Sequence, residues 1–261
     1  MIDIITSAQN HKIKNVLKLQ EKSAERRKQN LIVFEGSREL GLALNAGFKI
    51  RTLFVCLDVW GQKRVEGVNQ RDIFYISKEV FDKIAYREGS DGLIIVAEPQ
   101  YLTLQTLKLP ENPFLIILEA VEKPGNLGAI LRTADAAKVD AVIVCDPKTD
   151  IYNPNAIRSS VGCVFTTQVV ASTSDEVLEW LKAKGITSYA AALTATELYH
   201  NTDMTKPCSI IMGTEATGLT DKWLNNADKQ IKIPMRGQID SLNVSTCTAI
   251  LAFEAMRQRG F

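Results

Sequence analysis

Apolar and polar positions alternate with two different periods along the chain, and their order predicts an α/β protein. In the first part of the chain, short apolar runs are separated by stretches with apolar side chains every three to four positions. The runs predict strands at residues 31–35, 52–57, 72–76 and 93–97. The stretches predict helices at residues 8–28, 37–45 and 77–86. We expect these elements to form a small α/β domain.

A second and longer α/β series follows a segment without a sustained period. Residues 98–113 contain three prolines and predict a linker. Beyond them, strands are predicted at residues 114–119, 141–145, 166–171, 187–193, 208–212 and 230–233, and helices at residues 127–138, 155–162, 174–184, 219–226 and 244–258. This alternation predicts a mostly parallel sheet with helices on both faces. The expected domains are residues 1–97 and 114–261, joined by the linker.

Composition narrows the class of protein. The 261 residues are 46% hydrophobic, which is enough for a sizeable core, and no apolar run has the length of a membrane span. The N-terminus carries no signal-peptide pattern, so we expect a cytoplasmic protein without a membrane partner. The five cysteines are widely spaced and form no CxxC pair. This spacing argues against a disulfide framework and a zinc site, and predicts small buried side chains.

Charge is nearly balanced overall but uneven along the chain. The net charge is +1, while the first thirty residues alone carry an excess of four positive charges. Their basic residues are Lys12, Lys14, Lys18, Lys22, Arg26, Arg27 and Lys28. Such a cluster is suited to contact phosphates, and the alternative is an ordinary solvated helix face.

Three loops of the second series follow predicted strands, at the sheet edge where open α/β sheets bind ligands. The first loop, residues 122–132, contains two glycines, and Asn126 is predicted to cap the helix that carries Arg132. A helix start with a nearby arginine suits an anion, although the segment lacks the GK[ST] ending of a P-loop. The alternative is a plain glycine-rich turn with a surface arginine.

The other two loops also combine flexible backbone with isolated polar side chains. In the second loop, residues 212–219, Glu215 stands between two glycines and either accepts hydrogen bonds from a ligand or favours a helix start. The third loop, residues 233–243, contains Pro234 and Gly237 and ends in Ser241 and Asn243. Its alternative interpretation is an ordinary strand-to-helix connection capped by Asn243 or Ser245.

The residues of these loops together resemble a known family. The order NxGxxxR at 126–132, GxExxGL at 213–219 and IPMxGxxxSLNVS at 233–245 resembles the three motifs of the SpoU, or TrmH, group of SPOUT methyltransferases. This resemblance covers the chain from residue 114 to its end. Residues 34–50 (FEGSRELGLALNAGFKI) and 75–96 (YISKEVFDKIAYREGSDGLIIV) look like the substrate-binding domain of these enzymes, which is related to the ribosomal-protein L30e fold.

The resemblance implies methyl transfer from S-adenosylmethionine to a ribose 2′-hydroxyl of ribosomal or transfer RNA, with ribosomal RNA favoured. It also implies a deep trefoil knot in the C-terminal domain and a homodimer with its active site at the subunit interface. Backbone groups that would hold the cofactor lie around Leu193, Gly213, Ile233, Met235 and Leu242. Residues that would line the reacting centre are Asn126, Arg132, Glu215, Ser241 and Asn243, with Arg132 supplied by the partner subunit.

The chemistry of these residues leaves the proton acceptor open. The family's usual candidate matches Arg132, but proteins rarely deprotonate a guanidinium, so the alternative is that Arg132 holds a phosphate and stabilises developing alkoxide charge. His11 and His200 lie outside the motifs, and Cys247 is predicted to pack rather than react. Two other functions compete: an RNA-binding protein that has lost transfer, and a dehydrogenase, which the missing GxGxxG disfavours. The sequence does not identify the RNA or the target nucleotide.

Overall fold

The computed structural model describes residues 3–86 and 89–260 of the chain. Its contacts divide the chain into two compact units. Unit 1 contains Met1–Gln100 and Tyr152–Thr166, and unit 2 contains Tyr101–Ile151 and Thr167–Phe261. Arg87 and Glu88, which fall within the second segment that resembles a substrate-binding domain, lie outside the described residues.

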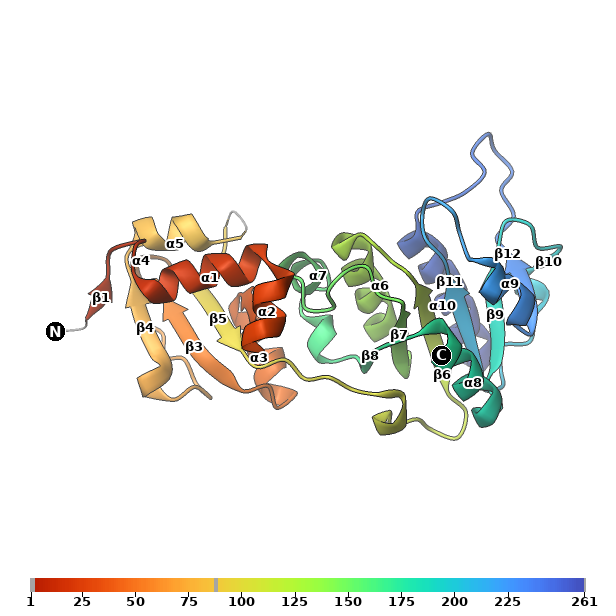
Figure 1. Ribbon diagram of the computed structural model, residues 1–261, viewed down its shortest axis with the longest axis horizontal. Coiled ribbons are helices and arrows are strands. Elements are labelled where there is room, and N and C mark those ends of the chain that lie inside the picture. Colours follow the sequence, from red (N-terminus) through yellow and green to blue (C-terminus); the bar gives the residue numbers. More distant parts are fainter. Residues whose placement is uncertain (1–2, 87–88, 261) are drawn as a thin grey trace. The chain divides into compact units, whose positions relative to one another are not determined.

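Unit 1 is built on a five-stranded mixed sheet with the strand order β1-β4-β3-β5-β2 (Figure 1). Strand β5 runs antiparallel to β2 and β3, whereas β4 runs parallel to β1 and β3. The strands are β1 (Ile4–Ile5), β2 (Ile32–Glu35), β3 (Ile50–Val55), β4 (Ile73–Ile76) and β5 (Leu93–Ala97). The expected small α/β architecture is therefore present, with a short additional strand, β1, that the apolar pattern did not predict.

The helices in the first part of unit 1 are α1 (His11–Glu21), α2 (Ser23–Gln29), α3 (Ser37–Asn45), α4 (Leu57–Trp60) and α5 (Lys78–Ile84). Of these, α1, α3 and α5 bury apolar side chains, whereas Arg26 is the buried residue of α2 and α4 has no buried residue. On α1, Ile13, Val16 and Leu19 are fully buried, as their helical spacing predicted. Ser77 caps α5, with its hydroxyl accepting from Val80 N–H at 3.4 Å. Ser37 is the first residue of α3, and its own N–H donates to Asp91 Oδ2 at 2.7 Å.

A segment from the middle of the chain completes unit 1. Helix α7 (Pro154–Ser159) packs against β2, and a short 3-10 turn, Cys163–Phe165, packs against α3. The Phe165 ring lies 4.8 Å from that of Phe34 and 4.9 Å from that of Phe48, between ring centroids. Because these aromatic contacts join distant parts of the chain, the compact units are not two continuous ranges.

Unit 2 contains a seven-stranded sheet with the strand order β10-β12-β9-β11-β6-β7-β8, in which every adjacent pair is parallel. This confirms the predicted parallel α/β architecture. Its strands are β6 (Phe114–Glu119), β7 (Ala141–Cys145), β8 (Val169–Ser172), β9 (Thr187–Ala191), β10 (Glu197–Leu198), β11 (Cys208–Met212) and β12 (Lys229–Lys232). Its helices are α6 (Pro124–Ala136), α8 (Ser174–Lys184), α9 (Asp221–Asn226) and α10 (Val244–Arg259).

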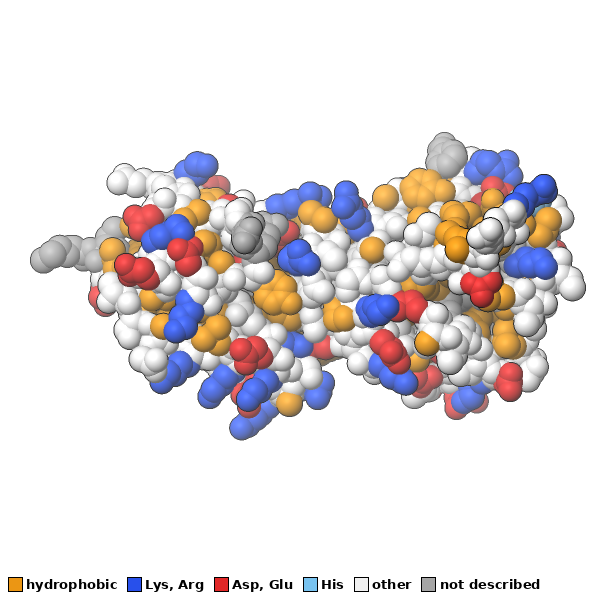
Figure 2. Space-filling model, turned by 90° about the horizontal axis from the view of Figure 1, so that it is seen from above, with side chains coloured by type: hydrophobic (Ala, Val, Ile, Leu, Met, Phe, Trp, Pro, Cys, Tyr) orange, Lys and Arg blue, Asp and Glu red, His pale blue; other side chains and the backbone are white. Residues whose placement is uncertain are grey.

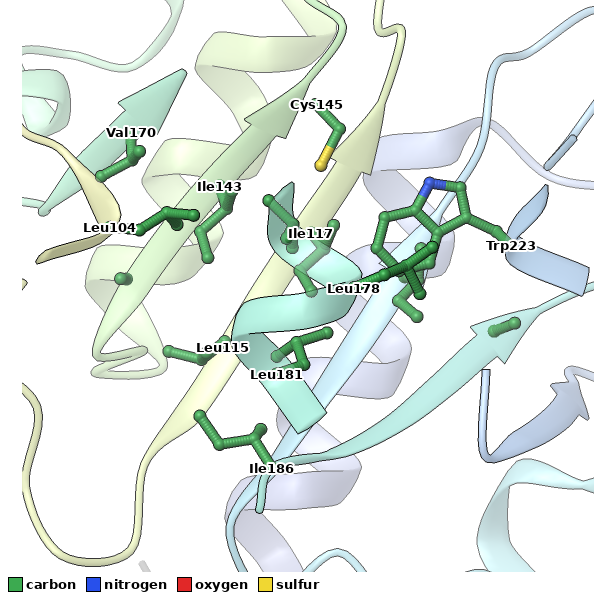
Figure 3. Close-up of a cluster of buried hydrophobic side chains, with 14 of the residues drawn as sticks. Leu104, Leu115, Ile117, Ile143, Cys145, Val170, Leu178, Leu181, Ile186 and Trp223 are labelled. Atoms are coloured by element: carbon green, nitrogen blue, oxygen red, sulfur yellow. The ribbon is translucent and has the colours of Figure 1, made fainter. Parts of the chain in front are cut away.

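The core of unit 2 explains why its strands read as continuous apolar runs. All residues of β6, β7 and β11 are buried, because helices cover both faces of the sheet. Figure 3 shows Leu178 and Leu181 of α8, together with Trp223 of α9, over the face that presents Leu115 and Ile117. Helices α6 and α10 lie behind the sheet in the same view and pack against each other.

The charged surface and the cysteines give no clear indication of a second functional site among the described residues. Over the face in Figure 2, Lys and Arg side chains are interspersed with Asp and Glu side chains. All five cysteines are free; four are buried, as predicted, and Cys247 is half-buried.

Among the described residues, no helix has the length and apolarity needed to cross a membrane. Within the same residues, no group of three or more His, Cys, Asp and Glu side chains is arranged to hold a metal ion.

Candidate functional site

The three loops are positioned by neighbouring elements of unit 2. Strands β6 and β11 are adjacent and parallel, so the first and second loops emerge side by side. The third loop follows β12, which β9 separates from β11. It projects beyond the sheet in Figure 1 and then enters α10. Because α10 packs against α6, the end of the third loop returns to the start of the first.

The start of α6 differs from the prediction. The helix begins at Pro124, after Lys123 as the N-cap residue, so Asn126 lies inside the first turn instead of capping it. Proline is favoured at this position because it has no N–H to leave unpaired. The Asn126 side chain is therefore available for other contacts. Two turns further on, Arg132 is exposed and has no hydrogen-bond or ion-pair partner within residues 3–86 and 89–260.

A hydrogen bond between two predicted site residues joins the first and third loops. Asn243 caps α10, as one of the two alternatives predicted, and its Oδ1 accepts from Ser245 N–H at 2.9 Å and from Ser245 Oγ at 2.6 Å. Because both donors bond to Oδ1, the orientation of the Asn243 amide is fixed and its Nδ2 is left to donate to another residue. Asn243 Nδ2 donates to Asn126 Oδ1 at 3.3 Å. Asn126 Nδ2 is buried and, within the described parts of the chain, has no partner.

The second loop is a tight turn that only glycine permits at its start. Thr214 N–H donates to Gly218 O at 3.0 Å, and Gly218 N–H donates back to Thr214 O at 3.1 Å. A Cβ atom on Gly213 would lie 2.2 Å from the carbonyl carbon of Gly218. Gly213 is thus required by the close approach of the loop to itself, whether or not it also contacts a cofactor.

Glu119, which the motifs do not include, fastens the second loop to β6. Its buried carboxylate accepts from Thr220 N–H at 2.8 Å and from Thr220 Oγ1 at 2.6 Å. Thr220 is the residue before α9, so these bonds fix the end of the loop that carries Glu215. In the sequence, Glu119 is visible only as a charged residue at the end of an otherwise apolar strand. That pattern does not reveal Thr220 as its partner.

Lys123 is a second polar residue that the motif pattern missed. Its Nζ lies 2.7 Å from Glu215 Oε2, which links the first and second loops by an ion pair. The hydrogen bond with Glu215 raises the pKa of Lys123. A cavity of about 300 Å³ lies beside this pair, and Val244 at the start of α10 also lines it. The cavity therefore borders the first and second loops and the residue that directly follows the third loop.

The remaining predicted residues stand apart from this cluster. Ser241 Oγ donates to its neighbour Asp240 at 3.1 Å and is exposed. Leu193, 62% exposed, follows β9, while Ile233 follows the adjacent β12. Across the described ranges, no hydrogen bond or ion pair connects Ser241, Arg132 or Leu193 to the other predicted site residues. The assignment of all ten residues to cofactor or reacting centre stays a prediction.

The histidine and cysteine side chains offer no nucleophile near the loops. The His200 ring stacks edge-on with its neighbour Tyr199, 5.2 Å apart between centroids, outside the cavity lining. Cys247 Sγ donates to Leu242 O at 3.7 Å, and burial raises the pKa of its thiol. A raised pKa disfavours the thiolate, which is consistent with a packing role.

Comparison with known proteins agrees with the geometry. Residues 113–253 match the SpoU rRNA methylase family, and residues 10–95 match the MRM3-like substrate binding domain. The chain is 30% identical over 251 residues to the 23S rRNA (guanosine(2553)-2′-O)-methyltransferase RlmP of Bacillus subtilis, covering 95% of this chain and 97% of the relative.

Two solved structures share the whole architecture. An RNA 2′-O ribose methyltransferase is 35% identical with a TM-score of 0.84, covering 98% of this chain and 99% of its own. An AdoMet-bound rRNA methyltransferase from Sinorhizobium meliloti is 27% identical with a TM-score of 0.87, covering 98% of both chains. With a family match over more than half of its length and relatives along nearly all of it, this chain belongs to the SpoU rRNA methylase family.

Proposed function

We propose that this protein transfers a methyl group from S-adenosylmethionine to a ribose 2′-hydroxyl of ribosomal RNA. The observation that carries the proposal is the connection of the three loops. Asn126 of the first loop is bonded to Asn243 of the third, and Lys123 of the first loop is paired with Glu215 of the second beside a cavity. Relatives of nearly full length, named as 23S rRNA and RNA 2′-O-methyltransferases, support the same activity.

The cofactor is assigned to the ends of β9, β11 and β12. Leu193 and Ile233 follow adjacent parallel strands, and Ile233, Met235 and Leu242 are half-buried. An apolar surface beside free loop backbone suits an adenine ring, which binds by stacking and by hydrogen bonds to N–H and C=O groups. When bound, the sulfonium supplies an electrophilic methyl group. Cofactor binding by the neighbour from Sinorhizobium meliloti supports this assignment.

The protein's own task is to place and activate the ribose oxygen. We assign Ser241 and Asn243 to orienting the ribose and Glu215 to accepting a hydrogen bond from it. Positioning of the reacting atoms and exclusion of water are expected to account for most of the rate enhancement. Arg132 would bind the adjacent phosphate and stabilise developing negative charge on the oxygen, because a guanidinium stays protonated at physiological pH.

A homodimer would complete the site. Arg132 has no partner in the described part of its own chain, and α10 is apolar on more than one side. Its buried Leu251 and Ala255 face unit 2, yet Phe253 is 43% exposed. A second copy packed on α10 would cover this surface and bring its own Arg132 to the loops. We further propose that the C-terminal segment is threaded as a trefoil knot, as in the family.

Unit 1 is assigned to RNA binding. Five of the seven N-terminal basic residues are exposed: Lys14, Lys18, Lys22, Arg27 and Lys28. Lys14 and Lys18 are four positions apart and so share one side of α1, and Lys22 directly follows the helix. These three side chains can contact phosphates. We assign residues 1–97 to RNA binding and residues 114–261 to catalysis, although residues 152–166 of the second range pack within unit 1. Because the substrate is ribosomal RNA, we place the protein in the cytoplasm.

Two measurements test the proposal. Isothermal titration should detect S-adenosylmethionine and S-adenosylhomocysteine, and absence of binding to either would refute the enzymatic function. Mapping of ribose methylation across ribosomal and transfer RNA, with and without the gene, should reveal at least one ribosomal nucleotide that loses its methyl group. Cofactor binding without any lost methylation in either RNA class would favour an RNA-binding protein that has lost transfer.

A further inference from the structure

Lys123 occupies a place that the family motifs do not explain. It is the N-cap residue of α6, and its ammonium crosses from the first loop to the second to meet Glu215 Oε2 at 2.7 Å. Strands β6 and β11 hold these two loops side by side, and Glu119 anchors the far end of the second loop through Thr220. The ion pair therefore joins two loops that the sheet already fixes.

The pair borders the cavity of the proposed site. The cavity of about 300 Å³ is lined by Lys123, Glu215, Gly213 and Val244, among others. Val244 directly follows Asn243, whose amide is bonded to Asn126. The charge of Lys123 consequently lies on the wall of this cavity, next to the residue that follows Asn243.

The two residues of the ion pair, Lys123 and Glu215, differ in exposure, and the exposed position of Lys123 argues against a mainly structural role. The Lys123 side chain is 71% exposed, whereas that of Glu215 is 23% exposed. An ion pair with one partner this exposed contributes little to stability. An ammonium group has three N–H donors, and Glu215 is the partner of Lys123 within the described residues. At this exposure, the other donors of Lys123, which also lines the cavity, are open to solvent.

Resting on the proposed function, we infer that Lys123 is a further substrate-binding residue, which binds a phosphate of the RNA strand while it holds the Glu215 carboxylate in place. Without Lys123, the Glu215 charge would repel an approaching phosphate at the cavity. With it, the pair is neutral and still offers donors to an anion. The same contact also orients Glu215 toward the ribose.

Equilibrium binding of unmodified 23S rRNA, transcribed in vitro, tests the phosphate contact. In a series of KCl concentrations, Lys123→Ala should weaken binding about three- to tenfold at 0.1 M KCl and reduce the slope of log Kd against log[KCl] by about one. Lys123→Arg should retain the slope, because it keeps the positive charge. The cofactor affinity of Lys123→Ala, measured by titration, should equal that of the wild type.

Two further variants separate substrate binding from a merely structural ion pair. Glu215→Gln should lower kcat for methyl transfer with little change in the salt slope, because Lys123 is still present. Lys229→Ala is the control: it removes the ion pair between Lys229 of β12 and Glu197 of β10, which lies outside the cavity lining, and should change neither quantity. An unchanged salt slope in Lys123→Ala would overturn the inference, as would an equal loss of slope in Lys229→Ala.

Failure of this inference is distinguishable from failure of the proposed function. If the wild-type protein binds no S-adenosylmethionine and transfers no methyl group to the 23S transcript, the proposed function is wrong and the inference falls with it. If the wild type is active and Lys123→Ala binds RNA with the wild-type affinity and salt slope, only the role of Lys123 is wrong.

Discussion

Two arginines, one in each unit, show how differently the fold uses the same side chain. Arg26 of unit 1 is only 3% exposed and donates to Leu19 O at 2.6 Å and Gln20 O at 3.2 Å, at the C-terminal end of α1. Arg132 of unit 2 is exposed and, in the described ranges, without a partner. Folding thus uses Arg26 for structure, whereas the Arg132 side chain takes no part in the hydrogen bonds or ion pairs of the described residues.

The comparison corrects the expected phosphate-binding cluster. Arg26 was among the seven basic residues predicted to contact RNA, and the prediction was wrong for this residue because its donors satisfy α1 carbonyls. Lys12 is also engaged, with its Nζ 4.4 Å from the centroid of the Phe74 ring. A count of charges along a sequence therefore overestimates those available to a ligand.

The largest expected effect is on catalysis by Arg132→Ala. Loss of the cation that binds the phosphate and stabilises the developing alkoxide should reduce kcat/KM for methyl transfer about 10²- to 10³-fold. The melting temperature should be unchanged, since the side chain is exposed. Single-turnover transfer of a labelled methyl group measures the effect. A variant with wild-type turnover would remove Arg132 from the reacting centre.

Arg26→Ala should act in the opposite way, on stability alone. Leaving buried α1 carbonyls without a charged donor should lower the free energy of unfolding by about 2–3 kcal/mol. Urea denaturation measures this change. Arg27→Ala, at the exposed neighbouring position, is the matched control and should stay within about 0.5 kcal/mol of the wild type. Equal losses in both variants would contradict the structural role of Arg26.

Asn243→Asp should give a smaller, purely functional effect in unit 2. Aspartate preserves the cap of α10, because its oxygen still accepts from Ser245, but it cannot donate to Asn126. We expect about a tenfold decrease in methyl transfer, or about 1.4 kcal/mol, with unchanged thermal stability. Asn153→Asp is the control. Asn153 caps α7 in the same way, by accepting from Asn155 N–H at 2.9 Å, and has no second amide partner among the described residues.

The smallest effect is expected on α1, and it sharpens the comparison within unit 1. Replacing Lys14, Lys18 and Lys22 together by Gln should reduce the salt slope of RNA binding by about two, with no loss of stability. Deleting the helix instead would remove the buried Ile13 and Leu19 and disturb the core. Replacing the exposed Lys108, Lys182 and Lys184 of unit 2 removes the same charge elsewhere. An equal decrease in both triple variants would indicate a general charge effect.

The sequence predicted correctly those elements whose formation depends on residues close together along the chain. Strands such as β6 and β7 were predicted with their observed bounds, because an apolar run between polar turns is a local signal. Helix α6 starts three residues before the predicted position, because Pro124 is favoured at the first helical position and Asn126 is not needed as a cap. The short strands β1 and β10 were missed, since two residues hold no recognisable period.

By itself, the sequence determined the parallel α/β architecture of unit 2, the order of its three loops and the family. Only the tertiary structure decided which polar groups meet. It joined Asn126 to Asn243 across 117 positions, and it paired Lys123 with Glu215. It also placed residues 152–166 in unit 1 and withdrew Arg26 from the surface. Strands and helices follow from neighbours along the chain, whereas these contacts depend on which strands lie side by side and on the burial that the packed helices impose.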